Sequence, residues 1–143
     1  MSPAPAASSG ILYEEYETGS PTASPRGLRL YLDGRHEEYT DVEYSVDAHG
    51  DLRSTPVPAG WHPRPPLDPA ALARVRKALV AAKAGAFPSE WRWSGQAPDT
   101  GTLTLRFELD GKTVESRVPS WPANAPAQVG ALLDAVTDAL REP

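Results

Sequence analysis

The sequence contains no cysteine. Disulfide bonds, thiolate nucleophiles and cysteine-ligated zinc sites are therefore excluded, although this absence leaves the compartment open. No apolar run approaches the roughly 18 residues that a membrane-spanning helix requires. The opening segment MSPAPAASSG lacks the basic start and the apolar core of a signal peptide, so we expect a disordered tail over residues 1–10 and a cytoplasmic protein.

The motifs of common enzymes are missing as well. No serine lies in a G-x-S-x-G context, and neither His36 nor His62 has the neighbours of an H-E-x-x-H or H-x-x-E-H site. The glycines are too dispersed to build a phosphate-binding loop. We therefore predict a protein that is not an enzyme and needs no cofactor, with an unrecognised enzyme as an alternative.

Charge is present but unevenly distributed. Residues 11–51 carry ten acidic and three basic side chains, residues 53–92 carry two and seven, and residues 93–143 carry seven and four, which gives the net charge of -5. This overall field repels nucleic acid and anionic membranes, so we expect neither as a partner. An acidic first half favours a partner protein with a basic surface, and the oligomeric state is not predicted.

The strongest structural pattern is the segment LTLRFELDGKTVESRV at residues 103–118. Asp-Gly favours a two-residue type I′ turn. With Asp110 and Gly111 in that turn, one face of the hairpin is apolar and the other is polar. The apolar face comprises Leu103, Leu105, Phe107, Val114 and Val118. We predict a sheet with one buried face and one solvated face.

A second Asp-Gly, Asp33-Gly34, predicts a hairpin that pairs Leu30 with Glu37 and Leu28 with Tyr39 by the same rule. The segment VEYSVDAHGDL then predicts another hairpin, with Val42, Tyr44 and Val46 on one face and Leu52 on the returning strand. Upstream, ILYEEYE has the alternation of an edge strand.

Two amphipathic helices follow. Asp68 and Pro69 form a helix start before a stripe of Leu72, Val75, Leu79 and Ala82, and Gly85 is placed to end it. The second helix carries a stripe of Val129, Leu132, Leu133, Val136 and Leu140. Between the hairpins, six prolines in residues 55–69 predict an extended crossover, with a ligand for an aromatic groove as the alternative.

The predicted fold class is therefore α+β, in a single domain over residues 11–143. An antiparallel β-meander and hairpin sheet of about five to six strands is covered by two helices, in the order β-meander, α, β-hairpin, α. The second half, with LARVRKALVAAKAGAFPSEW, TLTLRFELDGKTVESRV and the closing helix, resembles emfourin-type bacterial inhibitors of thermolysin-like metallopeptidases. That resemblance implies a protein-binding scaffold and carries no inhibitory residue over.

One segment resembles a metal site. DAHGD places Asp47, His49 and Asp51 at alternate positions, a spacing that could present two carboxylates and an imidazole to a cation. The segment has fewer ligands than a calcium-binding loop and lacks its distal bidentate glutamate. We therefore expect an ordinary turn in which Asp47 accepts backbone N–H bonds, and no metal.

Binding residues are predicted from charge and aromatic content. Trp91, Arg92 and Trp93 in EWRWSG have the residue types of protein-binding hot spots, and Glu37 and Glu38 belong to the acidic first half. We predict that these five residues form the surface of a non-catalytic protein-binding module of the inhibitor or immunity type. Two alternatives stay open: the tryptophans plug the ends of the sheet, or they form a small-ligand or carbohydrate site.

Overall fold

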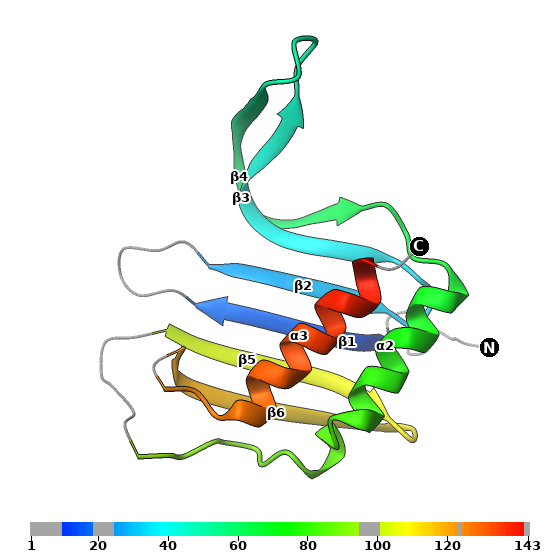
Figure 1. Cartoon of the computed structure of the whole chain (residues 1–143), viewed down its shortest axis with the longest axis vertical. Helices are drawn as coiled ribbons and strands as arrows, with labels where there is room; N and C mark the ends of the chain where they lie inside the picture. The colour runs from blue at the N-terminus through cyan, green and yellow to red at the C-terminus, as the bar shows by residue number, and fades with distance from the viewer. Residues whose placement is uncertain (1–9, 19–24, 95–100, 123, 142–143) are drawn as a thin grey trace, which may run out of the picture.

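The computed structural model describes residues 10–18, 25–94, 101–122 and 124–141. The described chain forms a six-stranded antiparallel sheet in the order β4-β3-β2-β1-β5-β6, with two helices on one face (Figure 1). The predicted α+β class, with a β-meander, is confirmed. The elements are β1 (Ile11–Thr18), β2 (Arg26–Tyr31), β3 (His36–Val46), β4 (Leu52–Arg64), α2 (Pro69–Ala81), a 3-10 turn (Ala84–Ala86), β5 (Gly101–Leu109), β6 (Lys112–Trp121) and α3 (Ala127–Arg141).

The β5–β6 hairpin has the predicted register. Leu109 lies opposite Lys112, Phe107 opposite Val114, and Leu103 opposite Val118. Its turn residues Asp110 and Gly111 have φ angles of 53° and 77°, as a type I′ turn requires. The apolar side chains of this hairpin consequently face the helices together with the buried Ser116, and most of its polar side chains face the opposite side of the sheet, which we call the open face.

The first Asp-Gly hairpin is shifted by one residue from the predicted register. Leu30 lies opposite His36 and Leu28 opposite Glu38. Gly34 has a φ of 96°, whereas Asp33 stays at negative φ, and the Gly34 N–H donates to the Tyr31 carbonyl at 3.0 Å. The loop therefore contains three residues rather than two. The shift brings His36 and Glu38 to the helix side of β3.

Strand β1 is central, not the predicted edge strand. It pairs with β2 on one side and with β5 on the other. Its acidic side chains are tolerated there because neighbouring strands supply partners: Arg29 Nε donates to Glu14 at 2.9 Å, and Arg26 lies 3.5 Å from Glu17. A β-bulge near Leu12 lets this leucine and Tyr13 both reach buried positions.

The proline-rich segment also departs from the prediction. Residues 55–64 continue strand β4, and only residues 65–68 connect the sheet to α2, so the predicted crossover over residues 55–69 is wrong for most of its length. The prolines are compatible with a strand here because β4 lies at the edge of the sheet, where a missing N–H can face away from the ladder.

The core lies between the sheet and the helices, which cross the face of β1 and β5 side by side (Figure 1). Asp68 caps α2 as predicted and accepts from the Ala71 N–H at 2.8 Å. The helix ends at Ala81, before the predicted Gly85, because Lys83 takes up the left-handed conformation with φ 55°. The fully buried core side chains include Tyr13, Leu30, Val75, Leu79, Leu105, Phe107, Val118, Leu132 and Val136.

Candidate functional site

A β-hairpin projects from the sheet and is the most prominent feature of the molecule (Figure 1). The β3–β4 ladder is interrupted between Thr40 and Val42, where the single residue Asp41 lies opposite residues 57–59. Such an irregularity bends a strand pair and increases its twist. Beyond it, β3 and β4 continue as a two-stranded ribbon, residues 42–56, which we call the arm.

The backbone at the bend is stabilised locally. The Thr40 hydroxyl accepts from the Val42 N–H at 3.1 Å and donates to the Val42 carbonyl at 2.9 Å. Opposite Val42 stands Pro56, which has no N–H to donate. Thr40 and Pro56 are therefore the residues of the sequence that favour the bend.

One face of the arm is apolar and exposed. Val46 lies opposite Leu52, and Tyr44 opposite Ser54, so these side chains share a face. The exposed fractions of Tyr44, Val46 and Leu52 are 64%, 68% and 70%. Their clustering distinguishes this face from an isolated exposed residue such as Val80 on α2, because contiguous exposed apolar surface is typical of interaction sites.

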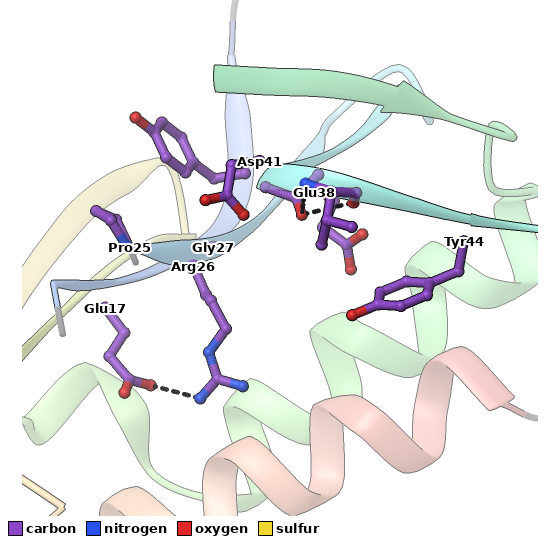
Figure 2. Close-up of a pocket in the computed structure, with 10 residues that line it drawn as sticks. Glu17, Pro25, Arg26, Gly27, Glu38, Asp41 and Tyr44 are labelled. Atoms are coloured by element: carbon purple, nitrogen blue, oxygen red, sulfur yellow. Dashed lines mark hydrogen bonds and ion pairs between the residues drawn. The ribbon is translucent and has the colours of Figure 1, made fainter. Parts of the chain in front are cut away.

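An acidic recess of about 560 Å³ lies at the base of the arm (Figure 2). We call it the first recess. Three carboxylates and one guanidinium line it, and Figure 2 shows Glu17, Arg26 and Tyr44 pointing into the same space. Its lining comprises Glu17, Pro25, Arg26, Gly27, Glu38, Tyr39, Thr40, Asp41, Val42 and Tyr44. The apolar arm and a negatively charged hollow therefore adjoin.

A second recess of about 490 Å³ extends from the first toward the C-terminal end of α3. The two share Glu17, Arg26, Gly27 and Glu38. In the second recess the partly buried Glu15 accepts a hydrogen bond of 2.8 Å from Tyr13 Oη. Burial raises the pKa of the Glu15 carboxyl and nearby Glu17 raises it further, against the lowering effects of the Tyr13 hydroxyl and Arg26.

The open face supports the base of the arm with an aromatic cluster. Tyr39 makes edge contacts with Tyr16 and Trp61, with ring centroids 5.2 Å and 5.4 Å away. The guanidinium carbon of Arg29 lies 3.9 Å from the Trp61 ring centroid. Gly27 is required beneath this ring, since an added Cβ would lie 2.8 Å from it. These contacts connect the four strands β1, β2, β3 and β4 on the open face, just before the bend.

The predicted residues Glu37 and Glu38 lie on opposite faces of β3. Glu37 is on the open face, where it accepts from Tyr31 Oη at 2.7 Å and lies 3.5 Å from Arg29. Glu38 is on the helix side, lines both recesses and pairs with Arg64 at 2.6 Å. Only Glu38 therefore belongs to the surface beside the arm.

The structure places Trp91, Arg92 and Trp93 at the other end of the sheet. The backbone of Trp91 bonds to Arg117 of β6, while β3 lies four strands away from β6. Trp91 Nε1 donates to the buried Ser116 hydroxyl at 2.9 Å, and its ring contacts Phe87. Trp93 is partly buried against the core, and Arg92 is exposed. The two tryptophans occupy positions that match the plug alternative.

The DAHGD turn uses its aspartate as a backbone acceptor. Asp47 Oδ1 accepts from the His49 and Asp51 N–H groups at 2.8 Å and 2.9 Å, and Arg53 donates to Oδ2 at 2.8 Å. The Arg53 hydrogen bond is the largest cause that holds the pKa of Asp47 below its usual value. Among the described residues, no group of three His, Asp or Glu side chains is arranged to hold a metal ion.

No protein-family model and no curated protein matches the sequence. No helix in the described ranges is long and apolar enough to cross a membrane.

The site residues that the sequence did not predict are Glu15, Glu17 and Arg26, and nothing in their local pattern indicates that they line a recess. Tyr44 and Val46 were predicted to share a face, with Leu52 on the returning strand, but the exposure of these side chains depends on the bend.

Proposed function

We propose that the chain is a non-catalytic protein-binding module of the inhibitor or immunity type, and that the arm and the first recess form its contact surface. The observation that supports this proposal most is the exposed apolar face of Tyr44, Val46 and Leu52. Three large apolar side chains in contact with water on a projecting ribbon gain free energy when a partner covers them.

The acidic recess favours a partner with basic side chains. Three of the four charged residues that line the first recess are carboxylates, and residues 11–51 have an excess of seven negative charges. Complementary charges accelerate association and select among partners, whereas the apolar contacts supply affinity. The arm lies outside the half of the chain that resembles emfourin-type inhibitors.

Small-ligand binding by the tryptophans has less support. Trp91 is engaged with Ser116 and Phe87, and one face of Trp61 is occupied by Arg29. A ring that stacks on a sugar or a flat ligand needs a free face. The aromatic side chains of the arm, by contrast, include the exposed Tyr44.

Affinity capture from cells that produce the protein tests this proposal. The bait is compared with a variant of the apolar face, Tyr44→Ser with Val46→Ser and Leu52→Ser. Its matched control is Val80→Ser, which removes a side chain of similar exposure from α2. We expect a protein that the wild type and the control retain and the arm variant loses. Equal retention by all three baits contradicts the proposal.

The two adjacent glutamates provide a second, electrostatic test. Glu38→Gln and Glu37→Gln remove the same charge on opposite sides of β3. With the captured protein as the binding partner, Glu38→Gln should slow association in a salt-dependent way, and Glu37→Gln should change it less. Stopped-flow kinetics at two ionic strengths measure the difference. An effect of Glu37→Gln alone would place the contact on the open face.

A further inference from the structure

One edge of the arm is free along the side that adjoins the first recess. Strand β2 pairs with β3 only as far as Tyr39, opposite Gly27. Beyond this residue, within the described ranges, β3 has β4 as its only neighbour. The first recess lies where the ladder between β2 and β3 stops, because it is lined by Gly27 and Arg26 on one side and by Val42 and Tyr44 on the other.

The direction of the free backbone groups follows from the pattern of the ladder. The Asp47 N–H donates to the Asp51 carbonyl at 2.9 Å, so this pair is a hydrogen-bonded one. Bonded and non-bonded pairs alternate in an antiparallel ladder, which makes Val46 with Leu52 and Tyr44 with Ser54 non-bonded pairs. The N–H and C=O groups of Tyr44 and Val46 therefore point away from β4, toward the free edge.

The two edges of the arm differ in how well they are protected against pairing with a further strand. On β4, Pro56 occupies an outward-facing position by the same alternation, and Pro58 and Pro63 follow along the strand. Prolines on an edge strand prevent a further strand from pairing. Strand β3 contains no proline, and the one outward N–H that is capped belongs to Val42, through Thr40. The edge beside the acidic recess is thus the one that stays available.

We infer that the free edge of β3, at residues 42–46, binds an extended segment of a partner protein as an additional antiparallel or parallel strand. The segment carries alternating apolar and basic side chains. Its backbone pairs with Tyr44 and Val46, its apolar side chains cover the arm face, and its basic side chains project from the opposite face, where the negative charge of residues 11–51 attracts them. This inference deepens the proposed function and rests on it.

A basic extended segment suits this edge for two physical reasons. A two-stranded ribbon is only marginally stable by itself in water, and a third strand supplies both the missing backbone partners and apolar cover. The recess beside the edge has three carboxylates and one guanidinium, so a second copy of this acidic chain would be repelled, whereas a basic segment would be attracted.

The probe for this inference is a blocked peptide of about eight residues in which valine and lysine alternate, long enough to span the arm. Fluorescence anisotropy measures its binding to the full chain. We expect saturable binding that weakens with salt, and no binding of the matching valine and glutamate peptide. Two further peptides are N-methylated on every valine or on every lysine. One of the two should lose binding and the other keep it, because alternate N–H groups of a strand point to opposite edges.

Variants on the two edges of the arm give the matched control. Val46→Pro removes an outward N–H on β3, Ser54→Pro removes the equivalent N–H on β4, and Val46→Ala separates the loss of the side chain. We expect Val46→Pro to weaken peptide binding by about tenfold or more relative to Val46→Ala, and Ser54→Pro to leave it unchanged. Circular dichroism and thermal unfolding verify that each variant is folded.

Each outcome decides between the two proposals. Absence of peptide binding, equal binding of both N-methylated peptides, or an equal effect of Val46→Pro and Ser54→Pro overturns strand addition. If the arm variant of the capture experiment still loses a partner in that case, the proposed function stands and the partner contacts the apolar face without pairing to β3. If capture is unaffected as well, both proposals fail.

Discussion

The side chain of Phe107 is central to the packing of the sheet on the helices, and its removal should cost a large part of the stability. Phe107 is fully buried on β5, opposite Tyr13 of β1 and Val114 of β6, and its ring is 6.3 Å from that of Phe87. Truncation of a buried phenylalanine to alanine typically costs about 3–5 kcal/mol, which combines the lost transfer free energy with that of the cavity. Domains are stable by about 5–15 kcal/mol in total.

Urea unfolding measures this effect. With a slope of about 1–3 kcal/mol per molar urea, Phe107→Ala should lower the midpoint by at least about 1 M. The control is Glu108→Ala, one residue along the strand on the open face, which should change the free energy of unfolding by less than about 0.5 kcal/mol. Phe107→Leu should lie between the two. Equal losses from Phe107→Ala and Glu108→Ala would refute the assignment of the two sides of the sheet.

Three further predictions concern the open face, the second recess and the turn of the arm. Gly27→Ala should destabilise the fold by about 1–3 kcal/mol in urea unfolding, because its Cβ would overlap the Trp61 ring and the Glu15 carbonyl. Since the pKa of Glu15 is raised in the folded state, the wild type loses stability as pH rises from the ordinary glutamate pKa to that raised value. Glu15→Gln should remove this loss, so that it unfolds at higher urea than the wild type at neutral pH and the difference shrinks in acid. If residues 47–51 only shape a turn, calcium, zinc and EDTA should leave the melting temperature unchanged, whereas a saturable rise that His49→Ala abolishes would establish a metal site.

The two Asp-Gly turns show how far local sequence determines a hairpin. Asp110 and Gly111 form the predicted type I′ turn, and the register of β5 and β6 follows from it. At Asp33 and Gly34 the same dipeptide closes a three-residue loop. There the surrounding chain decides: the Leu67 N–H donates to the Gly34 carbonyl at 2.8 Å, and the Leu32 N–H donates to that of Gly10 at 3.0 Å. Contacts from distant residues cannot be derived from the dipeptide.

Strand β1 illustrates why the position of a strand in a sheet is harder to predict than the strand itself. The alternation in ILYEEYE predicts an extended segment, and its glutamates are typical of an edge. Each glutamate in the structure has a partner from a neighbouring strand or its own: Arg29 for Glu14, Tyr13 for Glu15 and Arg26 for Glu17. Partners of this kind can be identified only once the three-dimensional arrangement of the strands is known.

The candidate site was predictable in part. The hairpin after Val42 and the common face of Tyr44 and Val46 follow from alternation. Alternation alone, however, cannot distinguish an exposed sheet face from one that helices cover. It therefore does not predict that the helices leave the arm face uncovered. The unequal numbers of residues at the bend, one on β3 and three on β4, become visible only when the register is known. Pro58 is one of those three residues, and it and the adjoining Pro56 are local indications of an interrupted strand.

The bend at Thr40 also divides the molecule into two parts that should differ in local stability, the arm and the sheet beneath it. The arm adds no side chain to the fully buried core, and its two strands have only each other as neighbours in the described chain. Its amides can therefore exchange with solvent deuterium through openings that leave the sheet beneath intact, at a free energy well below that of global unfolding. A partner that orders such a ribbon loses part of its contact energy to the restricted motion, and in return meets a surface that can adjust its twist to fit.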